Sequence, residues 1–500
     1  MNLARILDAA GHTVADAGSA GDAQVTGFAI DHRKVAPGTV FGAFEGQQVN
    51  GEDFIPAAIE AGAIAVVARP QARVEGALHI AHDNPRQAFA QLAARFFTPM
   101  PEHVAAVTGT NGKTSTAEMT RQIWRMAGER AASIGTLGVT TPDESVSTGL
   151  TTPDIVTFLS NMSGLAREGV SHVAFEASSH GLSQYRNEGV RPEAVAFTNF
   201  SRDHLDYHET MEAYFEAKMR LFDEVAGDDA TAVIWTGAER GEWTQRAIFH
   251  AEKRGLSLFT VGQSGDGIRL TGQEPTQLGQ TLSVEHDGTA RTISLPLIGA
   301  YQVSNALTAA GLALATGIDA GRVWDAVARL QPVRGRLERA VIASSGAPVY
   351  VDYAHTADAL ESAIAALRPH VEGKLITVFG AGGDRDTGKR APMGEVASRL
   401  SDVVIVTDDN PRGEDPAAIR AQVLAGAADN AREVGDRREA IAAAIGQSGA
   451  KDIVLVAGKG HETGQIVGAG EDMRVLPFDD VQVARECAAA ANEETGRNAI

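Results

Sequence analysis

The stretch VAAVTGTNGKTSTAEMTRQIW, residues 104–124, decides the fold class of this chain. Its pattern predicts an apolar strand, a glycine-bearing loop and then a helix. The loop glycines let the backbone approach phosphate oxygens, and the helix N-terminus adds N–H donors and its dipole. In such a loop Lys113 reaches the β- and γ-phosphates of a nucleotide, and the Thr114 hydroxyl binds Mg²⁺. The predicted phosphate-binding residues are Gly109, Thr110, Asn111, Gly112, Lys113, Thr114 and Ser115.

The spacing of this loop departs from the usual G-x-x-x-x-G-K-[ST] pattern, because Val107 stands where the first glycine is expected. A simple Gly-Lys turn before a helix is the alternative interpretation. The strand–loop–helix context favours the phosphate loop. Guanine recognition would need a separate base-reading motif such as N-K-x-D, and the chain has none. ATP is therefore the predicted nucleotide.

Segments on both sides of the loop alternate between strands and helices. After it, HVAFEASS (172–179), EAVAFTNF (193–200) and TAVIW (231–235) predict further strands of a mainly parallel sheet. Residues 254–297 alternate polar and apolar side chains, so part of that stretch is expected to be antiparallel, and a helix is expected from about Gln302. Before the loop, residues 40–44 and 63–67 predict strands and residues 56–62 a helix. FFTPMPEH (96–103) carries two prolines and predicts a linker.

The last third of the chain repeats an apolar strand followed by a polar loop. The four copies are VYVDYAH (349–355), LITVFGAGGDRD (375–386), VVIVTDDNPR (403–412) and IVLVAGKGHE (453–462). In open α/β sheets, ligands bind at the carboxyl ends of the strands, where all four loops lie. DDNPR is rich in turn-forming residues. Its position at a strand end favours a binding role over a turn alone.

Composition excludes several classes of protein. A chain of 500 residues with 44% hydrophobic and 22% charged residues predicts about three globular domains. The net charge of -20 argues against a general nucleic-acid or membrane-surface binder. The single cysteine, Cys487, allows no internal disulfide and fits a reducing compartment. The chain has neither a signal-peptide pattern nor an apolar run long enough for a membrane span. We therefore expect a cytoplasmic enzyme.

Three further side chains are candidates for metal chemistry. Glu176 and His204 follow neighbouring predicted strands, so together with Thr114 they could converge on a divalent metal ion. Each of them alone is a weak signal. Lys218 lies on a predicted helix, where the pattern by itself indicates an ordinary solvated lysine.

The chain resembles the Mur ligase family, most closely its diaminopimelate-adding type. The motifs that carry the resemblance occur in the family's order over nearly the whole chain: GTNGKTS, EASSHGLSQYR, NFSRDHLDYH, the helix with Lys218, YQVSN, GRLE, VDYAHTADAL, GGDRD, DNPR and GKGHE. The resemblance implies a three-domain α/β architecture: a UDP-sugar-binding domain (1–98), a central P-loop ATPase domain (99–330) and a Rossmann-like amino-acid-binding domain (331–500).

The resemblance also implies site residues. Lys113, Glu176, His204 and Lys218 would be catalytic, with Thr114, Glu176, His204 and a CO₂-derived carbamate of Lys218 holding Mg²⁺. Further ATP contacts would be Asn305, Arg336 and Asp352. The UDP-muramoyl peptide would contact Ile30, His32, Gln47, Gln48, Val49, Thr151, Thr152, Ser178, Gln184 and Arg186. Diaminopimelate would contact Arg385, Asp409, Asn410, Pro411, Arg412, Gly458 and Glu462.

Three positions depart from the family pattern. His32 stands where a serine is usual, Gln302 where an asparagine is usual, and Ala357 where a proline is usual. The serine contact is thereby put in doubt, although histidine can also donate a hydrogen bond. None of these changes removes a group that the chemistry requires.

The expected reaction is the ATP-dependent joining of meso-diaminopimelate to UDP-N-acetylmuramoyl-L-alanyl-D-glutamate through an acyl phosphate, by a monomer that binds neither nucleic acid nor membrane. Arg412 offers a planar fork for the distal carboxylate that lysine lacks, and Glu462 suits its ammonium. A lysine-adding relative or a folylpolyglutamate synthase is the nearest alternative. A P-loop switch or motor ATPase, or a non-enzymatic paralogue, would leave several of these motifs without a role.

Overall fold

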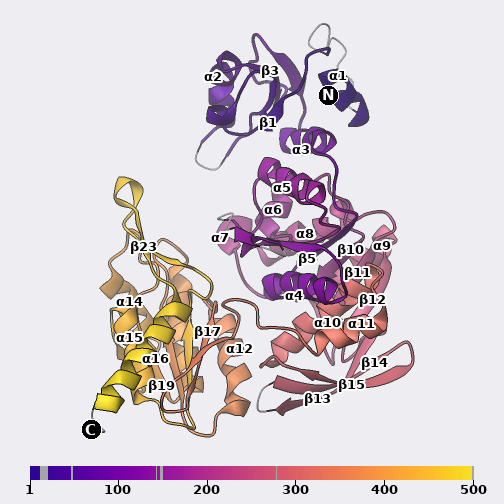
Figure 1. The fold of residues 1–500 in the computed structure, drawn as a ribbon. Coiled ribbons are helices and arrows are strands. Elements are labelled where there is room, and N and C mark those ends of the chain that lie inside the picture. Colours follow the sequence, from indigo (N-terminus) through magenta and orange to yellow (C-terminus); the bar gives the residue numbers. More distant parts are fainter. Residues whose placement is uncertain (12–20, 47–48, 142–143, 147–149, 277–278, 498–500) are drawn as a thin grey trace. The chain divides into compact units, whose positions relative to one another are not determined.

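The computed structural model describes residues 1–11, 21–46, 49–141, 144–146, 150–276 and 279–497 (Figure 1). The chain divides into two compact units. The first comprises Met1–Ile268 and Thr308–Val323, and the second comprises Arg269–Leu307 and Trp324–Ile500. The boundaries expected from sequence, at residues 98/99 and 330/331, stay a prediction. None of the described helices is long and apolar enough to cross a membrane.

The first unit begins with a small parallel sheet in the order β1-β2-β3-β4 (Gly27–Ala29, Thr39–Gly42, Ala63–Ala68, Leu78–Ala81). Helices α1 (Leu3–Ala9), α2 (Ile55–Glu60) and α3 (Pro85–Phe96) accompany it, with the short 3₁₀ helices η2 (His32–Lys34) and η3 (Gly51–Phe54). The predicted strands and helix are present. Residues 97–102, between the end of α3 and the start of β5, form neither helix nor strand, and their role as a linker between two domains stays a prediction.

The second sheet of this unit has the order β12-β11-β10-β5-β9-β6-β7-β8. Its strands are β5 (His103–Thr108), β6 (Ala131–Gly135), β7 (Gly138–Thr140), β8 (Ser145–Val146), β9 (His172–Glu176), β10 (Ala194–Phe197), β11 (Thr231–Thr236) and β12 (Ser257–Gly262). The pairs from β6 to β12 are parallel, as predicted, and β7 and β8 are antiparallel. Parallel strands are buried on both faces, which explains their continuous apolar runs.

The helices of this region are α4 (Lys113–Met126), α5 (Ile155–Arg167), α6 (Ser179–Ser183), α7 (Leu205–His208), α8 (Met211–Arg220) and α9 (Glu242–Arg254). A π-helical turn, η4 (Leu221–Val225), continues α8. The predicted helix after Gln302 is α10 (Ala300–Ala315), followed by α11 (Ala320–Val327). The predicted antiparallel stretch is also present, as β13 (Ile268–Thr276), β14 (Gly279–His286) and β15 (Thr289–Leu295).

The second unit contains a sheet in the order β16-β17-β21-β18-β19-β20. Its strands are β16 (Glu338–Ile342), β17 (Pro348–Asp352), β18 (Leu375–Phe379), β19 (Val403–Val406), β20 (Ala431–Glu433) and β21 (Ile453–Ala457). All neighbours are parallel except β16 and β17. The four strands predicted from the repeated pattern are therefore all in one sheet, with their polar loops at its carboxyl edge.

Helices cover both faces of this sheet (Figure 1). One core cluster includes side chains of α12 (Ala357–Leu367), α13 (Arg390–Leu400) and α14 (Pro416–Leu424), and a second includes those of α15 (Arg437–Gln447) and α16 (Asp480–Arg497). This doubly wound arrangement is the Rossmann-like domain that was expected.

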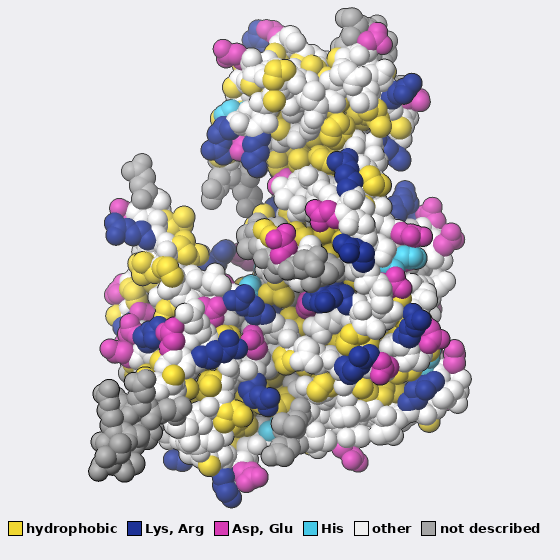
Figure 2. Space-filling model, viewed as in Figure 1, with side chains coloured by type: hydrophobic (Ala, Val, Ile, Leu, Met, Phe, Trp, Pro, Cys, Tyr) yellow, Lys and Arg dark blue, Asp and Glu magenta, His cyan; other side chains and the backbone are white. Residues whose placement is uncertain are grey.

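A two-stranded hairpin, β22 (Gly464–Val467) and β23 (Arg474–Pro477), follows β21. Three large hydrophobic side chains of the hairpin and its turn are exposed, Met473 (58%), Val475 (62%) and Leu476 (48%). Figure 2 shows hydrophobic surface in the region of this hairpin.

Candidate functional site

The loop between β5 and α4 has the backbone geometry of a phosphate-binding loop. Gly109 and Gly112 have φ angles of 143° and 85°, which favour glycine. A Cβ on Gly109 would lie 2.0 Å from the Thr198 hydroxyl, so no side chain fits there. Lys113 is the first residue of α4, and its ammonium donates to the carbonyl oxygens of Gly109 (2.9 Å) and Thr110 (2.7 Å). The amine therefore lies over the loop itself.

Thr114 and Glu176 come together beside this loop. Glu176 ends β9 in register with Val107 of β5, and it is 3% exposed. Its Oε2 accepts hydrogen bonds from the hydroxyls of Thr114 (3.0 Å) and Thr136 (3.1 Å), and its Oε1 accepts from the Thr136 amide (2.7 Å). Thr136 is a neighbour that sequence reasoning missed, because nothing in its local pattern marks it.

Lys218 is buried, which excludes the solvated side chain that its helical pattern suggested. It is 1% exposed, donates to the Gly109 carbonyl at 2.7 Å, and its ammonium lies 4.3 Å from the centroid of the Tyr214 ring. Burial, reinforced by the nearby positive charge of Lys113, holds the pKa of Lys218 well below its usual range. A buried lysine of this kind favours the neutral amine.

His204 lies in the same neighbourhood at the start of α7. Its φ is 52°, in the left-handed region, and its Nε2 lies 3.5 Å from Asp203. The His204 ring is 4.9 Å from that of His180 and 5.9 Å from that of Tyr214, the residue that also contacts Lys218. Within the described part of the chain, no group of three or more His, Cys, Asp and Glu side chains is arranged to hold a metal ion.

The five central residues assigned to the muramoyl peptide form one hydrogen-bonded strip next to Glu176. The hydroxyls of Thr136 and Thr151 lie 3.1 Å apart, and those of Thr152 and Ser178 lie 2.9 Å apart. Arg186 donates to the Thr152 carbonyl at 3.0 Å and to the Gln184 side chain at 2.7 Å. Gln184 also donates to the Tyr207 hydroxyl at 3.0 Å. The sequence interpretation did not single out Tyr207.

The residues assigned to the uridine end lie in the first sheet's loops. Ile30 and Val49 are 37% and 57% exposed. The His32 ring stacks on Phe54, with centroids 4.4 Å apart and an interplanar angle of 4°. His32 is thus held flat against an aromatic ring, which a serine at this position could not do. Gln47 and Gln48 lie outside the described residues.

The additional ATP candidates form a group within the second unit. Asp352 accepts hydrogen bonds from the amides of Leu337 (2.7 Å) and Ala354 (2.9 Å) and from the Tyr301 hydroxyl (3.3 Å), and burial raises its pKa. Asn305 donates to Gln302 at 3.4 Å, and Gln302 donates to the carbonyl of Arg336 at 3.1 Å. The Arg336 guanidinium lies 4.5 Å from the Tyr353 ring centroid.

The amino-acid candidates lie on three loops at the carboxyl edge of the second unit's sheet. Arg412 donates to the carbonyl of Gly383, in the loop of Arg385, at 2.8 Å. Arg385 itself is exposed. Gly458 has a φ of 116°, and a Cβ there would lie 2.6 Å from Oδ2 of Asp409. Asn410 and Pro411 are buried, and Arg412 is half-buried.

Asn410 and Glu462 meet around a residue that the sequence interpretation did not use. The Lys459 ammonium donates to Oδ1 of Asn410 at 2.9 Å and to Oε2 of Glu462 at 3.1 Å. The Asn410 side-chain amide also donates to Oε2 of Glu462 at 2.8 Å. The sequence signal that could have pointed to Lys459 is its position between two glycines directly after a buried strand.

Comparison with known proteins identifies the family. Three family models match the chain: the Mur ligase family, catalytic domain (24–97), the Mur ligase middle domain (107–313) and the Mur ligase, glutamate ligase domain (335–460). A curated protein of Zymomonas mobilis subsp. mobilis is 60% identical over 465 residues, which cover 93% of this chain and 95% of the relative. This chain belongs to the Mur ligase family.

Several relatives within the Mur ligase family have the same name. The Zymomonas protein, and one of Bradyrhizobium diazoefficiens that is 51% identical over 91% of this chain and 93% of its own, are both UDP-N-acetylmuramoyl-L-alanyl-D-glutamate--2,6-diaminopimelate ligases. A solved structure of that name matches with a TM-score of 0.72 at 32% identity, covering 98% of this chain and 99% of the other. A Thermotoga maritima MurF ligase in complex with ADP shares the fold, with a TM-score of 0.62 at 18% identity over 95% and 99% of the two chains. The predicted fold class, a three-domain Mur ligase architecture, is confirmed.

Proposed function

We infer that this Mur ligase joins meso-2,6-diaminopimelate to UDP-N-acetylmuramoyl-L-alanyl-D-glutamate at the expense of ATP, in peptidoglycan precursor synthesis. The observation that carries the proposal is a set of relatives named as diaminopimelate ligases of this kind, which are 47% to 60% identical over more than nine tenths of the chain. The polar loops at the carboxyl edge of the second unit's sheet support the choice of amino acid. A monomer in the reducing cytoplasm is part of the same proposal, and the single cysteine fits that compartment.

Each predicted domain receives one substrate in this proposal. Residues 1–98 hold the UDP-sugar, residues 99–330 hold ATP, and residues 331–500 hold the amino acid. The exposed Ile30 and the stacked His32 support the first assignment, and the glycine-rich loop before α4 supports the second. The predicted contacts Gln47 and Gln48 belong to the same proposal.

The chemistry divides into two transfers. The glutamyl carboxylate attacks the γ-phosphorus of ATP, ADP leaves, and an acyl phosphate forms. The amine of diaminopimelate then attacks the acyl carbon, loses a proton and expels phosphate, which leaves an amide bond. Catalysis of such a transfer is mostly positioning and charge stabilisation. Lys113 and the amides at the start of α4 face the phosphates, and the strip from Thr151 to Arg186 orients the muramoyl peptide.

The residues beside the phosphate loop fit a magnesium ion. Mg²⁺ prefers oxygen ligands and is usually bound by one or two carboxylates together with waters and substrate phosphates. The Thr114 hydroxyl and the Glu176 carboxylate provide such oxygens 3.0 Å apart, and His204 lies in the same neighbourhood. When bound, the ion supplies Lewis-acid stabilisation of the phosphate charges.

In this proposal the Lys218 amine adds CO₂ and becomes a carbamate. Only a neutral amine adds CO₂, and burial favours the neutral form of this one. As a carbamate, Lys218 would present an anion next to the Gly109 carbonyl, where a bare ammonium would repel a divalent cation.

The choice of amino acid can be tested at Arg412. Diaminopimelate differs from lysine by a second carboxylate, and Arg412 can bind it through two parallel hydrogen bonds. An arginine fork left unpaired should lead to rejection of lysine by up to about 10⁴-fold in kcat/KM. We expect Arg412→Ala to lower kcat/KM for diaminopimelate far more than for lysine, as measured by phosphate release with each amino acid.

Arg399→Ala is the matched control, because Arg399 is an exposed arginine of the same unit that forms an ion pair with Glu361. Arg399→Ala should leave kcat/KM for both diaminopimelate and lysine unchanged. Equal use of lysine and diaminopimelate by the wild-type enzyme would contradict the proposed substrate and favour the lysine-adding alternative. Activity with a folyl substrate in place of the muramoyl peptide would favour a folylpolyglutamate synthase.

A further inference from the structure

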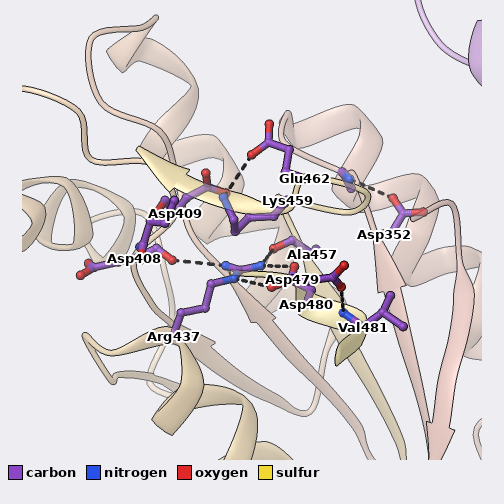
Figure 3. A network of polar contacts seen from close by, with 12 residues as sticks. Asp352, Asp408, Asp409, Arg437, Ala457, Lys459, Glu462, Asp479, Asp480 and Val481 are labelled. Carbon is purple, nitrogen blue, oxygen red and sulfur yellow. Dashed lines mark hydrogen bonds and ion pairs between the residues drawn. The ribbon is translucent and has the colours of Figure 1, made fainter. Parts of the chain in front are cut away.

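A fully buried ammonium connects the two loops that carry the amino-acid candidates. Lys459, in the loop after β21, is 0% exposed. It donates to Asn410, in the loop after β19, and to Glu462 in its own loop, as Figure 3 shows for the second contact. Because Asn410 also donates to Glu462, the three side chains form a closed triangle. Lys459 is the most deeply buried member of the triangle, since Asn410 is 3% exposed and Glu462 is half-buried.

The strand that follows this loop holds the backbone on both sides of Asn410. Gln465 donates to the Asp409 carbonyl at 2.6 Å, and the Ile466 amide donates to Oδ1 of Asn410 at 2.9 Å. The Arg412 amide donates to Ile466 at 3.1 Å, and Gly468 donates to the Arg412 carbonyl at 2.8 Å. Arg412 has a φ of 51°, which is unfavourable for a residue with a Cβ, so these bonds maintain a strained conformation.

Arg437 fixes the strand ends from which both loops begin. Its guanidinium donates to the carbonyl of Asp408, just after β19, at 3.3 Å and to that of Ala457, the last residue of β21, at 3.0 Å. Arg437 also forms an ion pair with Asp480 through its Nε and Nη2 atoms, and both side chains are fully buried (Figure 3). The loop origins are therefore rigid, and the orientation of Asn410 and Glu462 depends on the contacts made above them.

We propose that Lys459 is a positioning residue for amino-acid selection, which holds Asn410 and Glu462 in the orientation that receives the distal end of the incoming amino acid. This inference rests on the proposed function. A charged donor makes stronger hydrogen bonds than a neutral one, and it neutralises part of the charge on Glu462 without contacting the substrate. Its loss removes the charged donor from Oδ1 of Asn410 and Oε2 of Glu462, which then keep only neutral donors, the Ile466 amide and the Asn410 side-chain amide.

The test separates amino-acid binding from the other two substrates. Lys459→Met keeps the length of the side chain but removes its charge and its donors. We expect its KM for diaminopimelate to rise by about 10-fold or more, with KM for ATP and for the UDP-muramoyl peptide within about 2-fold of wild type. Gln465→Leu, at a half-buried site, should change the same KM in the same direction by a smaller factor, and it serves if Lys459→Met does not fold.

Thr377→Val is the matched control for a buried polar substitution. Thr377 is 0% exposed in β18 and contacts the Ser401 hydroxyl at 2.7 Å, away from all three loops. It should lower the free energy of unfolding without changing any KM. The inference is overturned if Lys459→Met and Gln465→Leu leave the KM for the amino acid unchanged, or raise all three KM values equally.

Failure of the proposed function gives a different result. If the wild-type enzyme uses lysine rather than diaminopimelate, the assigned substrate is wrong. The same KM comparison is then made with lysine. A selective rise in the KM for lysine would still support the role of Lys459, and no selective rise would overturn it.

Discussion

Two lysine side chains donate hydrogen bonds to the same backbone carbonyl oxygen, that of Gly109, in the loop between β5 and α4. Lys113 and Lys218 both donate to Gly109, at 2.9 Å and 2.7 Å, although only Lys218 is fully buried. Two positive charges so close together repel each other, and the buried amine loses its proton more readily. Burial and this repulsion both lower the pKa of Lys218 and favour its neutral form, whereas Lys113 is the lysine that we propose for the phosphates.

Replacement of Lys113 should affect catalysis and leave the fold intact. Its hydrogen bonds are to the loop carbonyls of Gly109 and Thr110 and contribute little to any core. Loss of one preorganised charge at a phosphoryl-transfer site costs about 10²- to 10³-fold in kcat. We expect Lys113→Ala to show this loss in ATP-dependent ligation with an unchanged urea unfolding curve. Wild-type turnover by the folded variant would contradict the phosphate-loop assignment.

Replacement of Lys218 should remove most of the ligation activity, and an added small carboxylate should restore part of it. Lys218→Ala deletes the proposed carbamate and leaves a gap next to the Gly109 carbonyl. Acetate or formate could enter this gap and restore the missing anion, so ligation should recover in part as the additive is raised. Chloride at the same ionic strength is the control. Full activity of Lys218→Ala without an additive would contradict the carbamate.

At the scale of elements, an ion pair joins the first residues of two helices that pack on the same face of the second unit's sheet. Arg437 is the first residue of α15 and Asp480 the first of α16, and both side chains are fully buried. The pair connects these helices with the ends of β19 and β21. Breaking a buried ion pair leaves one uncompensated charge, whereas replacing both partners by apolar groups does not.

We therefore expect Arg437→Met alone to lower the free energy of unfolding by about 3–5 kcal/mol. The double variant Arg437→Met/Asp480→Leu should recover a large part of that loss. Urea unfolding of the wild type, both single variants and the double variant gives the coupling energy directly. Additive effects of the two single changes would show that the ion pair does not act as a unit.

At the scale of the whole molecule, the last third has the cores that an independent domain needs. One cluster contains Leu360, Phe379 and Ile419, and the other contains Val378, Ile441 and Ala484, so apolar side chains are buried on both sides of one sheet. We expect a fragment of residues 331–497 to fold alone and to unfold cooperatively in urea, as followed by circular dichroism. A gradual, non-cooperative loss of helix signal would contradict the boundary at residue 331.

Local patterns were sufficient for much of the fold. Strands such as β9 and β18 are continuous apolar runs because parallel strands are buried on both faces, and the polar loops at their ends follow from the direction of the chain. The glycine-rich loop between β5 and α4 was recognisable because its glycines, lysine and threonine are adjacent in sequence, and its phosphate-binding role stays a prediction. These features depend on neighbours within a few residues, which a sequence displays.

What the sequence by itself determined was therefore the α/β class, the strands, the glycine-rich loop between β5 and α4, and the family. The tertiary structure alone decided that Lys218 is buried against Gly109, 109 residues away, and that Lys459 contacts Asn410, 49 residues away. It also paired Arg437 with Asp480 across 43 residues. Burial and pairing over such separations arise from the packing of whole elements, and the local pattern around a single lysine or arginine looks the same whether its charge is solvated or enclosed.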